Sequence, residues 1–123
     1  MITTNTLPAA TGKGRLITLW TLSSLAAVAF FAAGSAKMAG AATMVDLFDK
    51  VGLGQGFRYF TGFLEVAGAF GLLTSRYAYY AAVVLSTVMV GAIIAHMTVL
   101  GSSPAAPAML LVLSGTIAYL RKP

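Results

Sequence analysis

Four apolar runs occupy most of the sequence and leave little chain for any other kind of domain. They cover residues 16–38, about 57–73, 77–100 and 105–120. At about 1.5 Å per residue, a helix over the first run is long enough to cross the roughly 30 Å core of a bilayer. The second and fourth runs lie near the lower limit of about 17–25 residues for a span. The sequence therefore predicts an all-α membrane protein with four spanning helices, in a single domain over residues 1–123.

The composition excludes several classes of protein. Hydrophobic residues make up 59% of the chain and charged residues 9%, whereas soluble domains have about 45–50% and about 25%. A soluble enzyme and a nucleic-acid-binding protein are therefore excluded, and the net charge of +5 is interpreted as cations flanking the membrane. Because the sequence has no Cys, disulfides, thiolate catalysis and Cys-ligated metal sites are also excluded.

The first run has one competing interpretation, a cleaved signal peptide. Lys13 and Arg15 precede it, and the small residues 34–36 resemble a cleavage site. The apolar stretch over residues 16–33 exceeds the about 7–15 residues usual for a signal peptide, which favours a retained span.

The distribution of Lys and Arg predicts the orientation. One side of the membrane would carry Lys13, Arg15, Arg76, Arg121 and Lys122. The other side would carry Lys37, Lys50 and Arg58. Since the side with more cations is usually cytoplasmic, both termini are predicted in the cytoplasm.

The connection over residues 39–56 is predicted to contain a short helix. Its apolar stripe has helical spacing and consists of Met44, Leu47, Phe48 and Val51. Thr43 and Asp46 resemble a capping box that starts the helix, and Gly52 would end it. We expect this helix to lie in the outer interface. The other connections are short, which predicts an antiparallel up-down bundle.

Four ionisable residues fall inside the predicted spans, where such residues are costly and are functional candidates. They are Lys37, Arg58, Glu65 and His96. With the termini in the cytoplasm, all four fall in the outer half of the membrane, and Glu65 lies about 12 Å further along its helix than Arg58.

The second run predicts which way these residues face. One face is small or polar and consists of Arg58, Thr61, Gly62, Glu65, Gly68 and Ala69. The opposite face is bulky and consists of Tyr59, Phe60, Phe63, Val66 and Phe70. Because small residues let membrane helices approach closely, the polar face should point inward. His96 continues a stripe with Met89 and Ala92, and Lys37 continues one with Phe30 and Gly34.

This cluster has two interpretations. In the structural one, Glu65 is a partner for Arg58 or Lys37 and the polar groups lock helices together. In the functional one, a polar pocket binds a small lipophilic molecule, with Glu65 and His96 as catalytic proton donor and acceptor. Lys37, Arg58, Thr61 and Met89 would then contact the substrate. One His and one carboxylate do not make a zinc site, and haem ligation by a lone His has little support. Passage of ions fits poorly, since four short helices enclose little space unless the protein forms an oligomer.

Three segments stand out as motifs: Gly34-Ser35-Ala36-Lys37, the stretch from Phe57-Arg58-Tyr59 through Gly62-x-x-Glu65-x-x-Gly68, and Ala92-Ile93-Ile94-Ala95-His96. Together they resemble the DoxX-like family of membrane proteins. The resemblance covers roughly residues 15–120. It implies a four-helix bundle in a bacterial-type inner (plasma) membrane, with its polar signature at Lys37, Arg58, Glu65 and His96.

The resemblance also bounds the function. The family takes its name from a subunit of a thiosulfate:quinone oxidoreductase, and similar animal proteins act as receptor-assembly chaperones. We therefore expect binding of a quinone-, sterol- or epoxide-like molecule, with redox chemistry beside a partner or a cofactor-free acid/base isomerisation. Without Cys, electron transfer needs a bound quinone, flavin or haem. The alternative is a non-catalytic membrane subunit or assembly factor for a partner protein. Homo-oligomers would form through Gly91-x-x-x-Ala95 or the surface of Ser114-Gly115-Thr116.

Overall fold

The computed structural model describes residues 2–123, with side chains from Gly12 onward, and every regular element in that part of the chain is helical. The helices are α1 (Ile2–Ala39), α2 (Ala42–Val51), α3 (Gln55–Leu72), α4 (Ala78–Ala95) and α5 (Ala105–Arg121). A π-helical turn, η1 (His96–Leu100), continues α4. The predicted all-α class is therefore confirmed.

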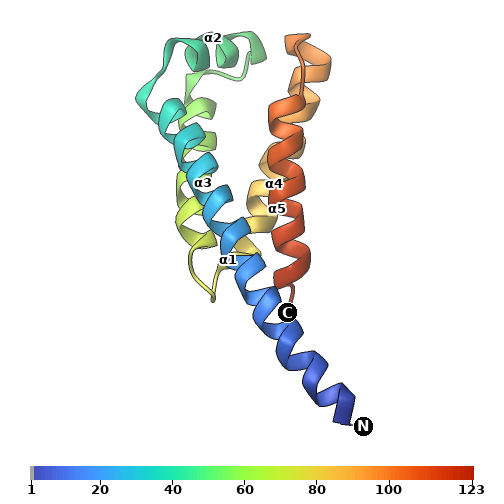
Figure 1. Cartoon of the computed structure of the whole chain (residues 1–123). Helices are drawn as coiled ribbons and strands as arrows, with labels where there is room; N and C mark the ends of the chain where they lie inside the picture. The colour runs from blue at the N-terminus through green and yellow to red at the C-terminus, as the bar shows by residue number, and fades with distance from the viewer. Residues whose placement is uncertain (1) are drawn as a thin grey trace.

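The four long helices run antiparallel in chain order (Figure 1). Helix α1 rises from the end of the molecule that holds both termini, and α2 crosses the opposite end. Helix α3 returns, α4 rises again, and α5 comes back beside the start of the bundle. We call the two ends the terminal end and the α2 end.

Two of these helices are long and apolar enough to cross a membrane by length and composition. They are Gly12–Ala39 in α1 and Ala78–Leu100, which joins α4 and η1. Helix α5 is apolar but shorter, and α3 does not reach the same level of apolarity because Arg58 and Glu65 lie within it.

The helix boundaries follow the predicted runs with two differences. Helix α1 begins at Ile2, well before its apolar run, because hydrophobicity marks burial or lipid contact and not the extent of a helix.

The predicted capping box is wrong. Helix α2 has Ala41 as its N-cap with no side-chain cap, so Thr43 already lies inside the first turn. The predicted end at Gly52 is confirmed, since Gly52 is left-handed (φ 82°) and its N–H donates to the Phe48 carbonyl at 3.2 Å.

The helices pack as two pairs, α1 with α3 and α4 with α5, which meet mainly through α3 and α4. Their shared core combines small and bulky apolar side chains. It consists of Ala26, Ala27, Phe30, Ala69, Leu72, Ala82, Leu85, Met89 and Ile117. Towards the α2 end the ribbons of the two pairs diverge, and α2 crosses there (Figure 1). Helix α2 contacts both α3 and η1, so it connects the two pairs at that end.

The α1–α3 contact is close because two glycines meet there. A Cβ placed on Gly34 would lie 2.8 Å from the Gly62 carbonyl oxygen. Only a residue without a side chain fits such an approach, as is common where membrane helices pack. This approach brings Lys37, one turn beyond Gly34, next to α3.

Candidate functional site

The polar face of α3 is buried, as its spacing predicts. All six residues of the predicted inward stripe are buried in the structure, together with Leu72. The opposite face is exposed at Phe60, Phe63 and Phe70. Helix α3 therefore directs its charged side chains into the protein and its aromatic side chains outward.

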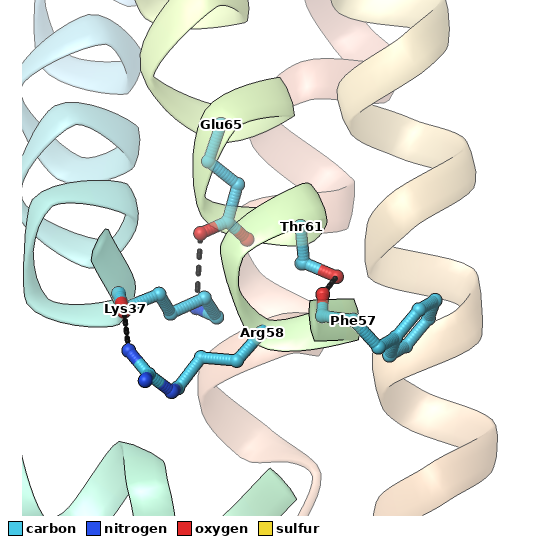
Figure 2. A network of polar contacts seen from close by, with 5 residues as sticks. All are labelled: Lys37, Phe57, Arg58, Thr61 and Glu65. Atoms are coloured by element: carbon cyan, nitrogen blue, oxygen red, sulfur yellow. Dashed lines mark hydrogen bonds and ion pairs between the residues drawn. The ribbon is translucent and has the colours of Figure 1, made fainter. Parts of the chain in front are cut away.

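Lys37 of α1 and Glu65 of α3 form an ion pair, with 2.9 Å between Lys37 Nζ and Glu65 Oε1. The Glu65 side chain is 1% exposed and the Lys37 side chain 15%. The second carboxylate oxygen, Glu65 Oε2, is buried and has no hydrogen-bond partner among the described residues. In Figure 2 this oxygen lies on the side of the carboxylate towards Thr61. The pair thus satisfies one oxygen of a buried carboxylate and leaves the other without a partner among the described residues.

Arg58 is buried and fastens the beginning of α3 to the end of α1. Its Nη1 donates to the Lys37 carbonyl (Figure 2), and its Nε donates to Gln55 Oε1 at 2.6 Å. The last carbonyls of a helix have no partner within the helix, so a cation is well placed there. The guanidinium carbon also lies 4.2 Å from the ring centroid of Tyr59. Of the two predicted partners for Glu65, the structure selects Lys37, while Arg58 binds the Lys37 carbonyl and the Gln55 side chain.

Gln55 belongs to this network and was missed by the sequence interpretation. Besides accepting from Arg58, it donates from Nε2 to the Val45 carbonyl of α2 at 3.0 Å. One signal was available, because Gln55 precedes Arg58 by three residues and so shares its helix face. Gln55 and Arg58 together tie the α1–α3 pair to α2.

Thr61 and Met89, two of the predicted substrate-contacting residues, are both buried. Thr61 is buried and donates from Oγ1 to the Phe57 carbonyl at 2.9 Å (Figure 2). Met89 is 4% exposed and belongs to the core. Leu85 of α4 packs against Gly68 of α3. Since these two helices are antiparallel, Met89, one turn beyond Leu85, lies at about the level of Glu65.

His96 lies in η1, half-buried, and its Nδ1 is 2.7 Å from Ser102 Oγ. In the same register His96 is at about the level of Phe57, roughly 12 Å along the bundle from Glu65. No hydrogen bond joins His96 to Glu65 within the described chain. The structure thus brings together Lys37, Arg58 and Glu65 and places His96 apart, also towards the α2 end. A π-helical turn is rare and frequently occurs at functional sites.

No group of three His, Asp or Glu side chains comes together in the described part of the chain. A shallow hollow on the outer side of the α1–α3 contact is lined by Ser35, Met38, Ala39, Phe63 and Val66. None of the predicted site residues lines it.

The all-helical fold has two helices that are long and apolar enough to cross a membrane and a buried ion pair between α1 and α3, which is compatible with a helical membrane protein. The chain belongs to the DoxX-like family, whose model matches residues 21–117. The matched segment contains every residue of the predicted site. Neither the curated proteins nor the solved structures contain a significant match to the chain.

Proposed function

We propose that this DoxX-like protein crosses the inner membrane four times and binds a small lipophilic molecule at the Lys37–Glu65 ion pair. Helices α1, α3, α4 and α5 are the proposed spans, with both termini in the cytoplasm and α2 in the outer interface. The observation that carries the proposal is that Glu65 Oε2 is buried and has no hydrogen-bond partner in the part of the chain whose side chains are described. An unsatisfied buried acceptor on a charged group is costly, so a ligand that donates a hydrogen bond to it is stabilised.

The chemistry of this oxygen indicates the class of ligand. A ligand hydroxyl donating to Oε2 would place its oxygen in the interior at the level of Thr61 and Met89, with its apolar body between the two helix pairs. Quinol-like and sterol-like molecules have this combination of one hydroxyl and a large apolar body. Glu65 would accept the hydroxyl proton and return it, with Lys37 stabilising the carboxylate. For a quinol, electrons would leave to a partner protein, and His96 would pass protons towards the outer surface.

Mass spectrometry of an organic extract from gently purified protein tests this proposal. The comparison is wild type against Glu65→Gln, whose amide oxygen can still accept from Lys37 while its NH₂ group replaces the free acceptor by a donor. Asp49→Asn is the matched control, because it removes one carboxylate from the exposed side of α2. We expect one lipophilic compound in the wild type and in the control, and its loss in Glu65→Gln. Bulk lipids alone in all three samples would overturn the proposal.

A second candidate function is a non-catalytic membrane subunit or assembly factor. It is favoured by one observation, that Lys37 and Arg58 are both engaged in contacts between helices and so hold the fold together. Chemical crosslinking in native membranes tests it. A crosslinked partner protein or homo-oligomer that persists in Glu65→Gln favours this function, and a solely monomeric species contradicts it.

The two predicted surfaces for self-association differ. Gly91 on α4 is exposed and open, whereas Ser114 is fully buried and hydrogen-bonds Ser86 Oγ at 3.0 Å. Ser114 is thus used inside the protein, in the α4–α5 contact. An association surface would centre on Gly91 and Ala95.

A further inference from the structure

At the terminal end, the start of the apolar part of α1 meets the end of α5 through two arginines and a tryptophan. The Arg15 guanidinium of α1 donates to the Leu120 carbonyl of α5. The Arg121 guanidinium carbon of α5 lies 5.0 Å from the ring centroid of Trp20 on α1. A cation over the face of an indole ring is a favourable arrangement, so Trp20 holds Arg121 in place. The hydrogen bond to Leu120 holds Arg15 at the same contact between α1 and α5.

The hydrogen bonding of Arg121 is incomplete. Its Nε and Nη2 atoms are buried, yet neither has a hydrogen-bond partner in the described chain. The three acidic side chains of the sequence are Asp46, Asp49 and Glu65, in α2 and α3, so neither α1 nor α5 supplies a carboxylate. Two adjacent N–H donors of a guanidinium match the oxygens of a phosphate group, which they bind in a bidentate manner.

An apolar hollow runs along α1 beside the same tryptophan. It is lined by Leu16, Ile17, Trp20, Thr21, Ser24 and Leu25. These residues cover about 14 Å of helix, starting next to Arg15 and leading into the apolar part of α1. Tryptophan is typical of the level where headgroups meet acyl chains. The hollow thus begins beside Arg15 in the sequence, and the Arg121 guanidinium lies over Trp20, one of its lining residues. Cationic donors beside an apolar hollow have the polarity of a phospholipid.

We propose that Arg15, Arg121 and the hollow beside Trp20 form a binding site for an anionic phospholipid. Its phosphate lies against the Arg121 donors, and one acyl chain lies along α1. Basic pockets between helices on the cytoplasmic side of a membrane recognise anionic headgroups, and the predicted orientation puts this site on that side. The site lies at the opposite end from the α2 end and is independent of ligand binding at Glu65.

The single tryptophan of the chain is a built-in probe for this site. The protein is reconstituted into phosphatidylcholine vesicles with a minor fraction of phosphatidylglycerol, and bromine is carried on the acyl chains of one lipid or the other. We expect Trp20 fluorescence to be quenched more by brominated phosphatidylglycerol than its mole fraction predicts. In Arg121→Gln this preference should fall about fivefold, the change associated with one cation at an anionic surface.

Arg76→Gln is the matched control, because Arg76 lies in the α3–α4 connection and its removal changes the net charge equally. Circular dichroism verifies the helix content, and Arg15→Gln repeats the test from the other helix. No preference in the wild type, or an equal loss in Arg76→Gln, would overturn the proposal. Loss of the preference on adding inorganic phosphate would identify free phosphate as the ligand and also overturn it.

Discussion

The α1–α3 and α4–α5 contacts are both antiparallel helix pairs, but they are held in different ways. Gly34 and Gly62 bring α1 and α3 into close backbone contact, and the Lys37–Glu65 ion pair lies one turn away. The α4–α5 contact is apolar apart from the hydrogen bond between Ser86 and Ser114. A Cβ placed on Gly91 in α4 would have no atom of another helix within 4 Å.

This difference shows where the fold is most strictly specified. Interlocking glycines and a buried ion pair fit one register, since a shift of either helix separates the charges and brings side chains into the glycine contact. An apolar pair with one hydroxyl contact tolerates small shifts. We therefore expect α1–α3 to behave as a fixed unit, and substitutions there to cost more free energy of unfolding than equivalent ones in α4–α5.

The largest effect is expected for Lys37→Met. Removing one partner of a buried ion pair leaves an uncompensated charge, at a cost of about 3–5 kcal/mol in the free energy of unfolding. The double variant Lys37→Met/Glu65→Met, which removes both charges, should recover most of that loss. Denaturant titration followed by circular dichroism measures both. Equal destabilisation of the single and double variants would contradict the assigned ion pair.

A smaller loss is expected for Gly34→Ala. The new methyl group would lie 2.8 Å from the Gly62 carbonyl oxygen and 2.9 Å from the Val66 nitrogen, so backbone must move. Overpacking of this kind costs about 1–3 kcal/mol.

The control for that variant is Gly91→Ala in α4, where the methyl group meets no neighbour. Alanine favours a helix over glycine by up to about 1 kcal/mol, so this variant should be neutral or more stable. Opposite changes in stability in the same thermal unfolding experiment would show that Gly34→Ala acts through the close α1–α3 contact and not through the loss of a helical glycine as such. Equal destabilisation by Gly34→Ala and Gly91→Ala would contradict the close α1–α3 contact at Gly34.

The smallest loss is expected for Ser114→Ala. It removes the hydrogen bond to Ser86, which in a membrane helix contact is worth about 0.6–2 kcal/mol. Thr116→Ala is the control, because Thr116 is exposed and its hydroxyl donates to the Val112 carbonyl of its own helix. Thermal unfolding should separate the two variants. A loss as large as that of Lys37→Met would show that the pairs are equally specified.

The inward face of α3 was predictable because its small and polar residues recur at helical spacing and so share one face, while its aromatic residues share the opposite face. The location of Lys37, Arg58 and His96 towards one end was predictable too, since each lies near the end of an apolar run. Both features depend only on the sequence of a single helix, so they can be predicted without knowing how the helices pack.

Which cation pairs with Glu65 was not predictable, because the answer depends on how closely two helices approach. The Gly34–Gly62 contact sets that approach and selects Lys37, and Arg58 then reaches the Lys37 carbonyl. The role of Gln55 depends on the position of α2. That position follows from the left-handed turns on either side of α2. The π-helical turn at His96 has no clear signal in the apolar run that contains it.

The Lys37–Glu65 pair also has a consequence for biosynthesis. An isolated charged residue in the middle of an inserting helix costs about 2.5–3.5 kcal/mol at the translocon, and α3 carries Glu65 without enough apolar residues to rank among the membrane-length helices. In the proposed four-span arrangement, α1 emerges from the ribosome first and holds the complementary lysine. Insertion of α3 would then require α1 to remain close to the translocon, so that Lys37 can pair with Glu65. The order of the two helices along the chain would therefore contribute to membrane insertion.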